Sequence, residues 1–297
     1  MIPTERCALQ PEIFAEIANF VTEQADRLRI SVYNEEKHEG VLRHVYLRRG
    51  HYSGEICLCL VARRKVPEFQ KLAKSVTGRF PQITGVVLNI NREKTNVILG
   101  DEEIVLAGKP DISDTMCSVK VEISPRAFYQ VNTPAAEALY AQAAEFAEPE
   151  GKLLLDLYCG AGTIGLSMAG KARRLIGAEI VPQAVENARR NAERNSIGNA
   201  EFICADAGQA AKQLESAGER QDVIIHDPPR KGCDDATLTA CAGMQPERIV
   251  MISCNAATAA RDCKRLEELG YALKKVRPFD LFPRTSHVEC AAVLIKK

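Results

Sequence analysis

Apolar side chains in the first part of the chain recur with helical spacing and then with strand-like spacing. Ile13, Ile17, Phe20 and Val21 lie three or four positions apart, and we predict an amphipathic helix over residues 11–28. Short alternating or wholly apolar runs between turn residues predict strands at residues 30–33, 41–47, 55–61, 85–91, 96–100 and 117–123, and a helix at 67–77. These elements predict a two-layer α+β domain.

From Gly151 onward the pattern becomes a regular alternation of strands and helices. Strands are predicted at residues 153–158, 174–179, 200–205, 222–227, 248–253, 271–278 and 287–296, and helices at 163–169, 183–195, 207–216, 236–241 and 256–269. Such alternation builds a parallel sheet covered on both faces, with ligands at the carboxyl ends of its strands. We therefore predict an α/β protein, in which a smaller α+β domain (residues 1–118) precedes a Rossmann-like domain (residues 119–297).

Composition and charge exclude some classes of protein but do not indicate a function. The 297 residues can form two domains, and 39 basic against 39 acidic side chains give no global basic field that would indicate nucleic-acid binding. No apolar stretch is long enough to span a membrane and the first ten residues lack a signal-peptide core, so a cytoplasmic protein is expected. The 11 cysteines include no C-x-x-C pair, which argues against a disulfide framework or a zinc site.

Two arginine clusters in the first domain have two possible interpretations. Residues 48–49 and 63–65 carry consecutive basic side chains that are suited to phosphate binding. A solvated sheet edge is the plainer interpretation of both.

The most informative stretch is residues 153–165, which read Leu-Leu-Leu-Asp-Leu-Tyr-Cys-Gly-Ala-Gly-Thr-Ile-Gly. A buried strand here turns sharply into a helix, and Gly160, Gly162 and Gly165 match the G-x-G-x-x-G pattern. Missing side chains at such positions let the backbone approach a ligand and let the helix pack closely on the strand. The motif indicates an adenosine-bearing ligand without separating NAD from S-adenosylmethionine.

Acidic residues lie at the carboxyl ends of the next three predicted strands. Glu179 is suited to accepting hydrogen bonds from a ribose diol, Asp206 to holding an adenine amino group, and Asp227 to a place at the rim of the pocket. The set favours S-adenosylmethionine over NAD, although Asp is also a common cap at such positions. Asp227-Pro228-Pro229-Arg230 is more specific, because its two prolines force an extended stop beside a carboxylate that suits a flipped base.

Cys254 and Glu289 are the candidates for chemistry. Cys254 lies between a strand and a helix, where unpaired amides and the helix dipole are expected to lower its thiol pKa from about 8.5. Cys159 is interpreted instead as packing under the glycine turn. Glu289 begins an apolar strand, so it is either a general base or one half of a structural ion pair. His287 has no assigned role.

These residues resemble the RNA uracil-5-methyltransferase family, and most of all its bacterial 23S ribosomal RNA branch. The resemblance covers nearly the whole chain and rests on five motifs in the family's order. They are residues 124–132 (Ser-Pro-Arg-Ala-Phe-Tyr-Gln-Val-Asn), residues 156–162, residues 227–230, residues 253–255 with 260–262 (Ser-Cys-Asn and Ala-Arg-Asp), and residues 282–285 (Phe-Pro-Arg-Thr) with His287 and Glu289.

The resemblance implies a reaction and roles for its residues. S-adenosylmethionine would supply a methyl group to C5 of a uridine in 23S rRNA, with Cys254 as the nucleophile that adds to C6 and Glu289 as the base that removes the C5 proton. The implied cofactor-binding residues are Gln130, Tyr158, Gly160, Thr163, Glu179, Asp206 and Asp227. The implied partner is RNA, with residues 1–118 as the central, RNA-binding domain and residues 119–297 as the methyltransferase catalytic domain. No membrane association is implied, and the chain is expected to be a monomer.

One departure concerns an iron–sulfur cluster. Members of the ribosomal branch hold such a cluster by four cysteines, and residues 5–10 resemble the context of the last one, at Cys7, yet no cysteine precedes it. The chain thus resembles a member without its N-terminal part, which would carry a small β-barrel RNA-binding domain. A 4Fe-4S cluster is then expected in a full-length form and not in this chain. The other interpretation is a natural short form with Cys7 simply buried.

Four alternatives remain at this point. An NAD-dependent dehydrogenase explains the glycine turn but neither Cys254 nor Glu289. An amino-directed nucleic-acid methyltransferase shares Asp-Pro-Pro but normally has an aromatic residue where this chain has Arg230. A tRNA uracil-5-methyltransferase differs only in its substrate. A truncated, non-catalytic RNA-binding protein is the alternative from a different class.

Overall fold

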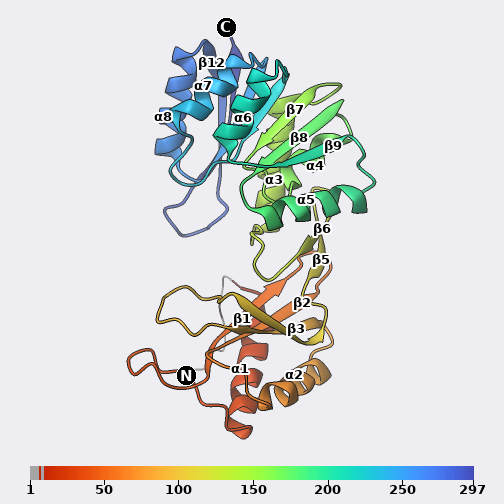
Figure 1. Cartoon of the computed structure of the whole chain (residues 1–297), viewed down its shortest axis with the longest axis vertical. Helices are drawn as coiled ribbons and strands as arrows, with labels where there is room; N and C mark the ends of the chain where they lie inside the picture. The colour runs from red at the N-terminus through yellow and green to blue at the C-terminus, as the bar shows by residue number, and fades with distance from the viewer. Residues whose placement is uncertain (1–6, 8–9) are drawn as a thin grey trace. The chain divides into compact units, whose positions relative to one another are not determined.

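The computed structural model describes residue 7 and residues 10–297. The chain divides into two compact units. The first runs to Asp114 and includes Glu122–Ala127, and the second comprises Thr115–Val121 and Phe128–Lys297 (Figure 1). The predicted boundary between residues 118 and 119 falls in the turn of a two-stranded sheet, formed by β5 (Ile112–Met116) and β6 (Val119–Ile123). Whether the two units are separate functional domains stays a prediction.

The first unit is a four-stranded sheet packed against two helices. Its elements are α1 (Glu12–Arg27), β1 (Leu42–Arg49), β2 (Ile56–Ala62), α2 (Glu68–Arg79), β3 (Ile83–Ile90) and β4 (Glu102–Gly108), and the strand order is β1-β2-β3-β4. Ile17 and Val21 of α1 and Phe69 and Leu72 of α2 pack on Leu58 and its strand neighbours in one buried cluster. The predicted two-layer α+β arrangement is therefore confirmed.

The prediction of two further strands in this unit is wrong. Residues 30–33 contribute a single bridge, Val32 to Leu42, and residues 96–100 form a loop before β4. In that loop, the Asn91 amide donates to the carbonyls of Val97 and Ile98 at 2.8 and 3.0 Å, and the Asn89 amide donates to the carbonyl of Gly100 at 2.9 Å. These side-chain bonds occupy carbonyls that a β-ladder would otherwise use.

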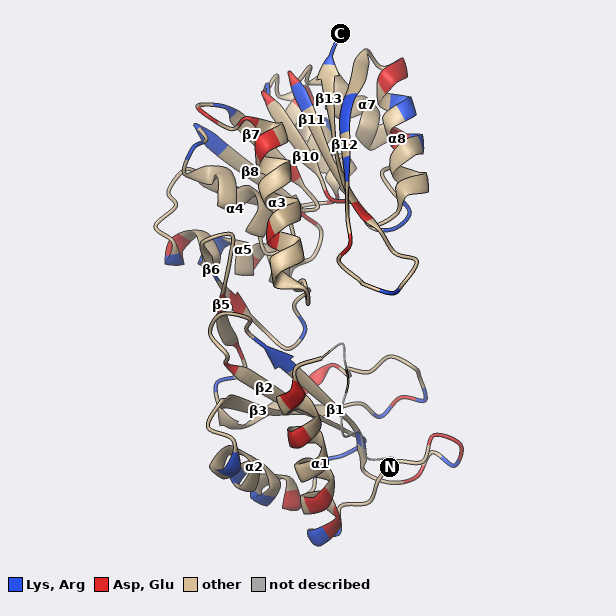
Figure 2. Cartoon of the chain, turned by 180° about the vertical axis from the view of Figure 1, so that it is seen from behind, with Lys and Arg blue, Asp and Glu red and all other residues tan. Residues whose placement is uncertain are grey.

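The second unit is a seven-stranded sheet with helices on both faces. Its strands are β7 (Leu153–Leu157), β8 (Arg174–Glu179), β9 (Ala200–Cys204), β10 (Val223–His226), β11 (Arg248–Ser253), β12 (Tyr271–Phe279) and β13 (Glu289–Lys296). Its helices are α3 (Thr133–Ala147), α4 (Thr163–Ala169), α5 (Pro182–Arg194), α6 (Ala207–Ser216), α7 (Asp235–Gly243) and α8 (Ala256–Glu268). Helices α6, α7 and α8 pack on one face, and α3 and α4 lie over the other (Figure 2). The predicted α/β fold class is confirmed.

The prediction of a parallel sheet is wrong at one edge. The strand order is β12-β13-β11-β10-β7-β8-β9, and β13 runs antiparallel to both of its neighbours, while β7 to β11 pair in parallel. The reason is that residues 280–288 join β12 to β13 without a crossover helix, so the chain reverses direction. The start of β13 consequently lies beside the carboxyl end of β11.

Helix α3 was not predicted from the sequence. It is rich in alanine, so its apolar and polar positions contrast weakly. Its N-terminus nevertheless carries a recognisable signal, because Asn132 is the N-cap, its side chain accepts the N–H of Ala135, and Pro134 follows in the first turn. The other predicted elements of this unit lie within a few residues of the observed ones.

None of the described helices is both long enough and apolar enough to cross a membrane.

Candidate active site

The glycine turn is built from residues with positive φ angles. Tyr158, Gly160 and Gly162 have φ of 64°, 55° and 80°, and Gly162 caps the start of α4. A Cβ on Gly165 would lie 2.8 Å from both Asp156 Oδ2 and the Leu175 side chain, so this position requires glycine. A Cβ on Gly160 would meet nothing within 4 Å. The turn is therefore tightly packed on its helix side and open at Gly160.

Two carboxylates hold this turn in place. The Gly165 N–H donates to Asp156 Oδ2 at 2.9 Å beneath the turn. Above it, Glu179 accepts the N–H of Gly160 at 3.1 Å with one oxygen and the N–H of Val181 at 2.9 Å with the other. Each Glu179 oxygen keeps a further lone pair, so the carboxylate is fixed and still able to accept from a ligand.

Asp156 is the buried acid of the turn, and burial raises its pKa to about 7. Its Oδ1 atom has no hydrogen-bond partner in the described part of the chain. Since the folded pKa lies above the unfolded value of about 3.9, ionisation costs stability progressively as pH rises between these values. The full cost, up to about 4 kcal/mol for a shift of some three pKa units, applies above the folded pKa.

We expect Asp156→Asn to remove this cost. Asn can still accept the Gly165 N–H, so the free energy of unfolding of the variant should exceed that of the wild type increasingly from pH 5 to pH 8. Urea unfolding followed by circular dichroism at several pH values measures the difference. A difference that does not change with pH would contradict the assignment.

The remaining cofactor-binding candidates lie in the same unit, and two of them already have partners. Asp206 is the N-cap of α6 and accepts the N–H of Gly208 at 3.0 Å. Thr163 is the first residue of α4. The half-buried Gln130 hydrogen-bonds to the hydroxyl of Tyr140, a buried residue of α3 that also faces the charges of Asp227 and Asp156. Tyr140 was missed in the sequence because its helix was missed.

Tyr158 points its hydroxyl toward α7. It makes side-chain hydrogen bonds with Thr237 and Cys233, and its ring packs against the hydrophobic clusters under α6, α7 and α8. Burial raises the pKa of this phenol. Next to Tyr158, the chain presents Cys159 to the interior, where its sulfur lies 3.8 Å from the carbonyl oxygen of Gly160, as expected for a packing residue.

The catalytic candidates face each other across two antiparallel strands. Ser253 of β11 pairs with Cys290 of β13, and continuing this register by one residue sets Cys254 opposite Glu289. Glu289 is buried with 6% of its surface exposed, and Cys254 is half-buried. The charges of Glu289, Asp227 and Arg230 all act on the Cys254 thiol. The structure therefore brings together residues from β10, β11 and β13.

The expected lowering of the Cys254 pKa is wrong. Burial raises the pKa of this thiol, the carboxylates of Glu289 and Asp227 add to the rise, and Arg230 only partly opposes them. At the N-terminus of α8, the Asn255 side chain already accepts the N–H groups of Ala257 and Thr258. Activation of Cys254 therefore depends on what binds beside it.

The two carboxyl groups near Cys254 also have raised pKa values. Burial raises the pKa of Asp227 to about 8, and the carboxylates of Asp156 and Glu289 contribute. Burial raises the pKa of Glu289, while Arg230 lowers it. The raised pKa of Asp227 favours its protonated form, which can donate as well as accept a hydrogen bond.

A clamp from α8 holds the loop that follows Asp227. Arg261 Nη2 donates to the carbonyls of Lys231 and Cys233 at 2.9 and 3.1 Å, and Arg261 also pairs with the buried Asp262 at 2.6 Å. Asp262 in turn accepts the N–H of Cys233 at 2.8 Å.

Nearer the start of the helix, Asn255 and Thr258 donate to the carbonyl of Arg230 at 3.2 and 3.3 Å. Together with the bonds of Arg261 and Asp262, these contacts fix the Arg230 loop relative to the Cys254 turn.

We expect Asp262→Ala to loosen this clamp. It leaves the N–H of Cys233 without its acceptor and Arg261 without its carboxylate, at a cost of about 2 kcal/mol in the free energy of unfolding. Any reaction at Cys254 should be impaired more than ligand binding at the glycine turn, because the loop carries Arg230 but does not include that turn. The matched control is Asp235→Ala, which removes an exposed ion pair between Arg265 and α7 and should cost less than about 1 kcal/mol. Equal effects of the two variants would contradict the clamp.

Other sequence candidates lie apart from this cluster. His287 is exposed, and its backbone N–H donates to Thr285 Oγ1 at 3.2 Å. Cys7 is half-buried with a free thiol, and no group of three or more metal-binding side chains gathers in the described part of the chain. Residues 5, 6, 8 and 9 of its predicted motif context lie outside the described residues. A role for Cys7 as a cluster ligand stays a prediction.

Comparisons with known proteins agree with one another. The family model described as tRNA (Uracil-5-)-methyltransferase matches residues 12–297. An uncharacterized RNA methyltransferase of Halalkalibacterium halodurans is 44% identical over 99% of this chain and 65% of its own length. One from Clostridium tetani is 40% identical over 97% of this chain and 63% of its own length. The chain thus spans less than two thirds of these relatives.

A solved structure is also similar. It is the Pyrococcus abyssi tRNA (uracil-54, C5)-methyltransferase in complex with S-adenosyl-L-homocysteine, at 30% identity and a TM-score of 0.84. The similarity covers 99% of this chain and 70% of that one.

Proposed function

The chain belongs to the tRNA (uracil-5-)-methyltransferase family, and on that premise we propose that it transfers a methyl group from S-adenosylmethionine to C5 of a uridine in RNA. The observation that carries the proposal is the placement of Cys254 opposite Glu289, with Asp227 and Arg230 beside them. A nucleophilic thiol and a nearby base are what methylation of an unreactive pyrimidine carbon requires. A dehydrogenase would need neither.

The residues around the glycine turn fit S-adenosylmethionine. The open side of Gly160 admits a ligand to the backbone, and the fixed Glu179 carboxylate is positioned to accept from ribose hydroxyls. Asp206, Thr163, Gln130 and Tyr158 complete the proposed cofactor-binding set. When bound, the cofactor supplies an electrophilic methyl group on a positively charged sulfur.

Cys254 starts the reaction as the thiolate, after its thiol proton has passed to solvent water, by forming a bond from Sγ to C6 of the uracil. The C5–C6 π electrons move toward C5 and the C4 carbonyl, which makes C5 nucleophilic enough to take the methyl group. Burial and the nearby carboxylates raise the pKa of the Cys254 thiol, so the thiolate needs a stabilising positive charge. The Arg230 guanidinium, which lowers this pKa, supplies it.

Glu289 completes the reaction. Its carboxylate removes the proton from C5, the C5–C6 double bond re-forms, and the Cys254 sulfur leaves with the electrons of its bond to C6. The raised pKa of Glu289 makes it a stronger base than an exposed carboxylate. In its protonated form, which the raised pKa favours, Asp227 offers one donor and one acceptor that match the N3–H and O4 edge of uracil.

We propose 23S ribosomal RNA as the substrate, on the resemblance of the five sequence motifs to the ribosomal branch. A tRNA substrate is the second candidate, because the family model and the Pyrococcus abyssi neighbour are both described as acting on tRNA. Incubating the protein with methyl-labelled cofactor and either 23S rRNA fragments or tRNA transcripts, followed by nuclease digestion, separates them. Labelled 5-methyluridine should appear in the rRNA, and its absence from both RNAs would refute the function.

A further inference from the structure

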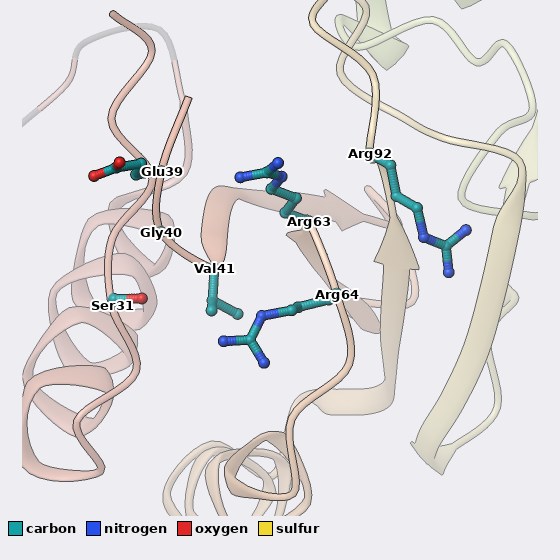
Figure 3. Close-up of a pocket in the computed structure, with 7 residues that line it drawn as sticks. All are labelled: Ser31, Glu39, Gly40, Val41, Arg63, Arg64 and Arg92. Atoms are coloured by element: carbon teal, nitrogen blue, oxygen red, sulfur yellow. The ribbon is translucent and has the colours of Figure 1, made fainter. Parts of the chain in front are cut away.

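A hollow of about 560 Å³ opens in the first unit. The residues that line it are Ser31, Glu39, Gly40, Val41, Arg63, Arg64 and Arg92 (Figure 3). The guanidinium groups of Arg63 and Arg64 extend toward the segment that carries Ser31 and Glu39, and Arg92 comes from the neighbouring loop. Three basic side chains and one acidic side chain are thus among the residues that line this space, which we call the arginine hollow.

The arginine hollow lies at the carboxyl ends of two parallel strands. Ala62, the last residue of β2, pairs with Ile90, the last residue of β3, and α2 connects the two strands. Arg63 and Arg64 directly follow β2, and Arg92 follows β3 by two positions. Ligands of α/β units bind at this edge, where loops from neighbouring strands converge.

Hydrogen bonds hold both arginine-bearing loops in place. The N–H of Arg63 donates to the carbonyl of Val41 at 2.8 Å, and the N–H of Asn91 donates to the carbonyl of Ala62 at 2.8 Å. The buried Arg43 donates to the carbonyls of Asn91, Glu93 and Thr95 at 2.8 to 3.1 Å. These hydrogen bonds hold the backbone of the loop that carries Arg92 in place.

The charges of the hollow are only partly neutralised. Arg92 forms an ion pair with Glu102 at 2.9 Å, and both of these side chains are exposed. The Arg63 guanidinium donates one hydrogen bond to the carbonyl of His38. For Arg64, the described residues provide no carboxylate within ion-pair distance. Guanidinium groups with free donors favour phosphate oxygens, which they can bind through two parallel hydrogen bonds.

The lining also indicates which part of a nucleic acid it would contact. None of the seven residues is aromatic, so the hollow offers no aromatic ring on which a base could stack. Contacts from arginine to phosphate oxygens fix the position of a nucleic acid and carry no sequence information. The geometry points to the phosphodiester backbone of the RNA substrate as the ligand, and we propose that the arginine hollow binds it. This inference rests on the proposed function for the identity of the nucleic acid.

The test compares two double variants with equal charge changes. Arg64→Ala with Arg92→Ala leaves the Arg63 bond to His38 intact, and Lys71→Ala with Lys74→Ala removes two exposed charges from α2 outside the hollow. Binding of a fluorescein-labelled, uridine-rich single-stranded RNA is measured by anisotropy over a range of salt concentrations. Each lost phosphate contact lowers the slope of log K against log salt by about 0.7. We expect a reduction of about 1.4 for the arginine variant and less than half of that for the lysine variant.

The salt slopes and the formation of a covalent adduct together distinguish a failure of this proposal from a failure of the proposed function. Equal slopes for the two variants, or no RNA binding by the wild type at low salt, would overturn the phosphate site. RNA containing 5-fluorouridine, at saturating concentration with S-adenosylmethionine, reports independently on Cys254 by forming a stable covalent adduct. An adduct together with equal slopes refutes the hollow alone, whereas a reduced slope without an adduct refutes the methyl-transfer mechanism alone.

Discussion

Cys254→Ala is expected to abolish methyl transfer while leaving S-adenosylmethionine binding unchanged. Without Sγ no bond to C6 can form, so C5 of the uracil stays a poor nucleophile, and the rate should fall on the order of 10⁵-fold or more. The cofactor should still bind, because the glycine turn and Glu179 lie on β7 and β8, on the other side of β10 from Cys254.

Two measurements check this expectation. Transfer of labelled methyl groups to RNA reports on turnover, and calorimetry reports on cofactor affinity. Cys204→Ala is the matched control, since Cys204 is an exposed thiol of the same unit for which we propose no role. Residual turnover by Cys254→Ala within tenfold of the wild type would show that the reaction does not pass through this sulfur.

Glu289→Gln is expected to stop the reaction one step later. The amide keeps the size of the side chain but cannot take the C5 proton, so methylated RNA should remain bonded to Cys254. A covalent protein–RNA complex should therefore accumulate with ordinary uridine RNA and S-adenosylmethionine, a condition under which the wild type releases its product. Product formation should fall by about 10²–10⁴-fold, the usual contribution of a general base.

Denaturing gel electrophoresis with labelled RNA detects this complex. The double variant Cys254→Ala with Glu289→Gln should form none, which identifies the attachment point. Glu289→Asp keeps the basic group and should recover part of the turnover. A Glu289→Gln variant that turns over like the wild type would mean that Glu289 is a structural carboxylate, the alternative that its position in the sequence left open.

The local chemistry of the site could be inferred from the sequence, but its electrostatics could not. The glycine positions follow from short-range geometry, since Gly165 has no room for a Cβ and Gly160 and Gly162 have positive φ. The direction of the Cys254 pKa shift came out opposite to the expectation. It depends on burial and on carboxylates that are 27 and 35 positions away in sequence and adjacent in space.

The missed elements have related physical causes. Helix α3 has weak amphipathic contrast, and with it the sequence interpretation missed Tyr140, the partner of Gln130. Residues 96–100 form a loop instead of the expected strand, because the side-chain amides of Asn89 and Asn91 donate hydrogen bonds to carbonyls in that segment. The pattern of apolar and polar residues along the sequence gives no information about hydrogen bonds that side chains make across a loop.

By itself, the sequence determined the alternation of strands and helices, the glycine turn and which residue types could form the candidate site, because these depend on neighbours along the chain. Only the tertiary structure decided that β13 runs antiparallel beside β11 and so sets Glu289 opposite Cys254. It also decided that Arg261 and Asp262 clamp the loop of Arg230, and that Arg63, Arg64 and Arg92 share one hollow. Each of these depends on which strands become neighbours, and that is set by the packing of the whole sheet rather than by any single segment.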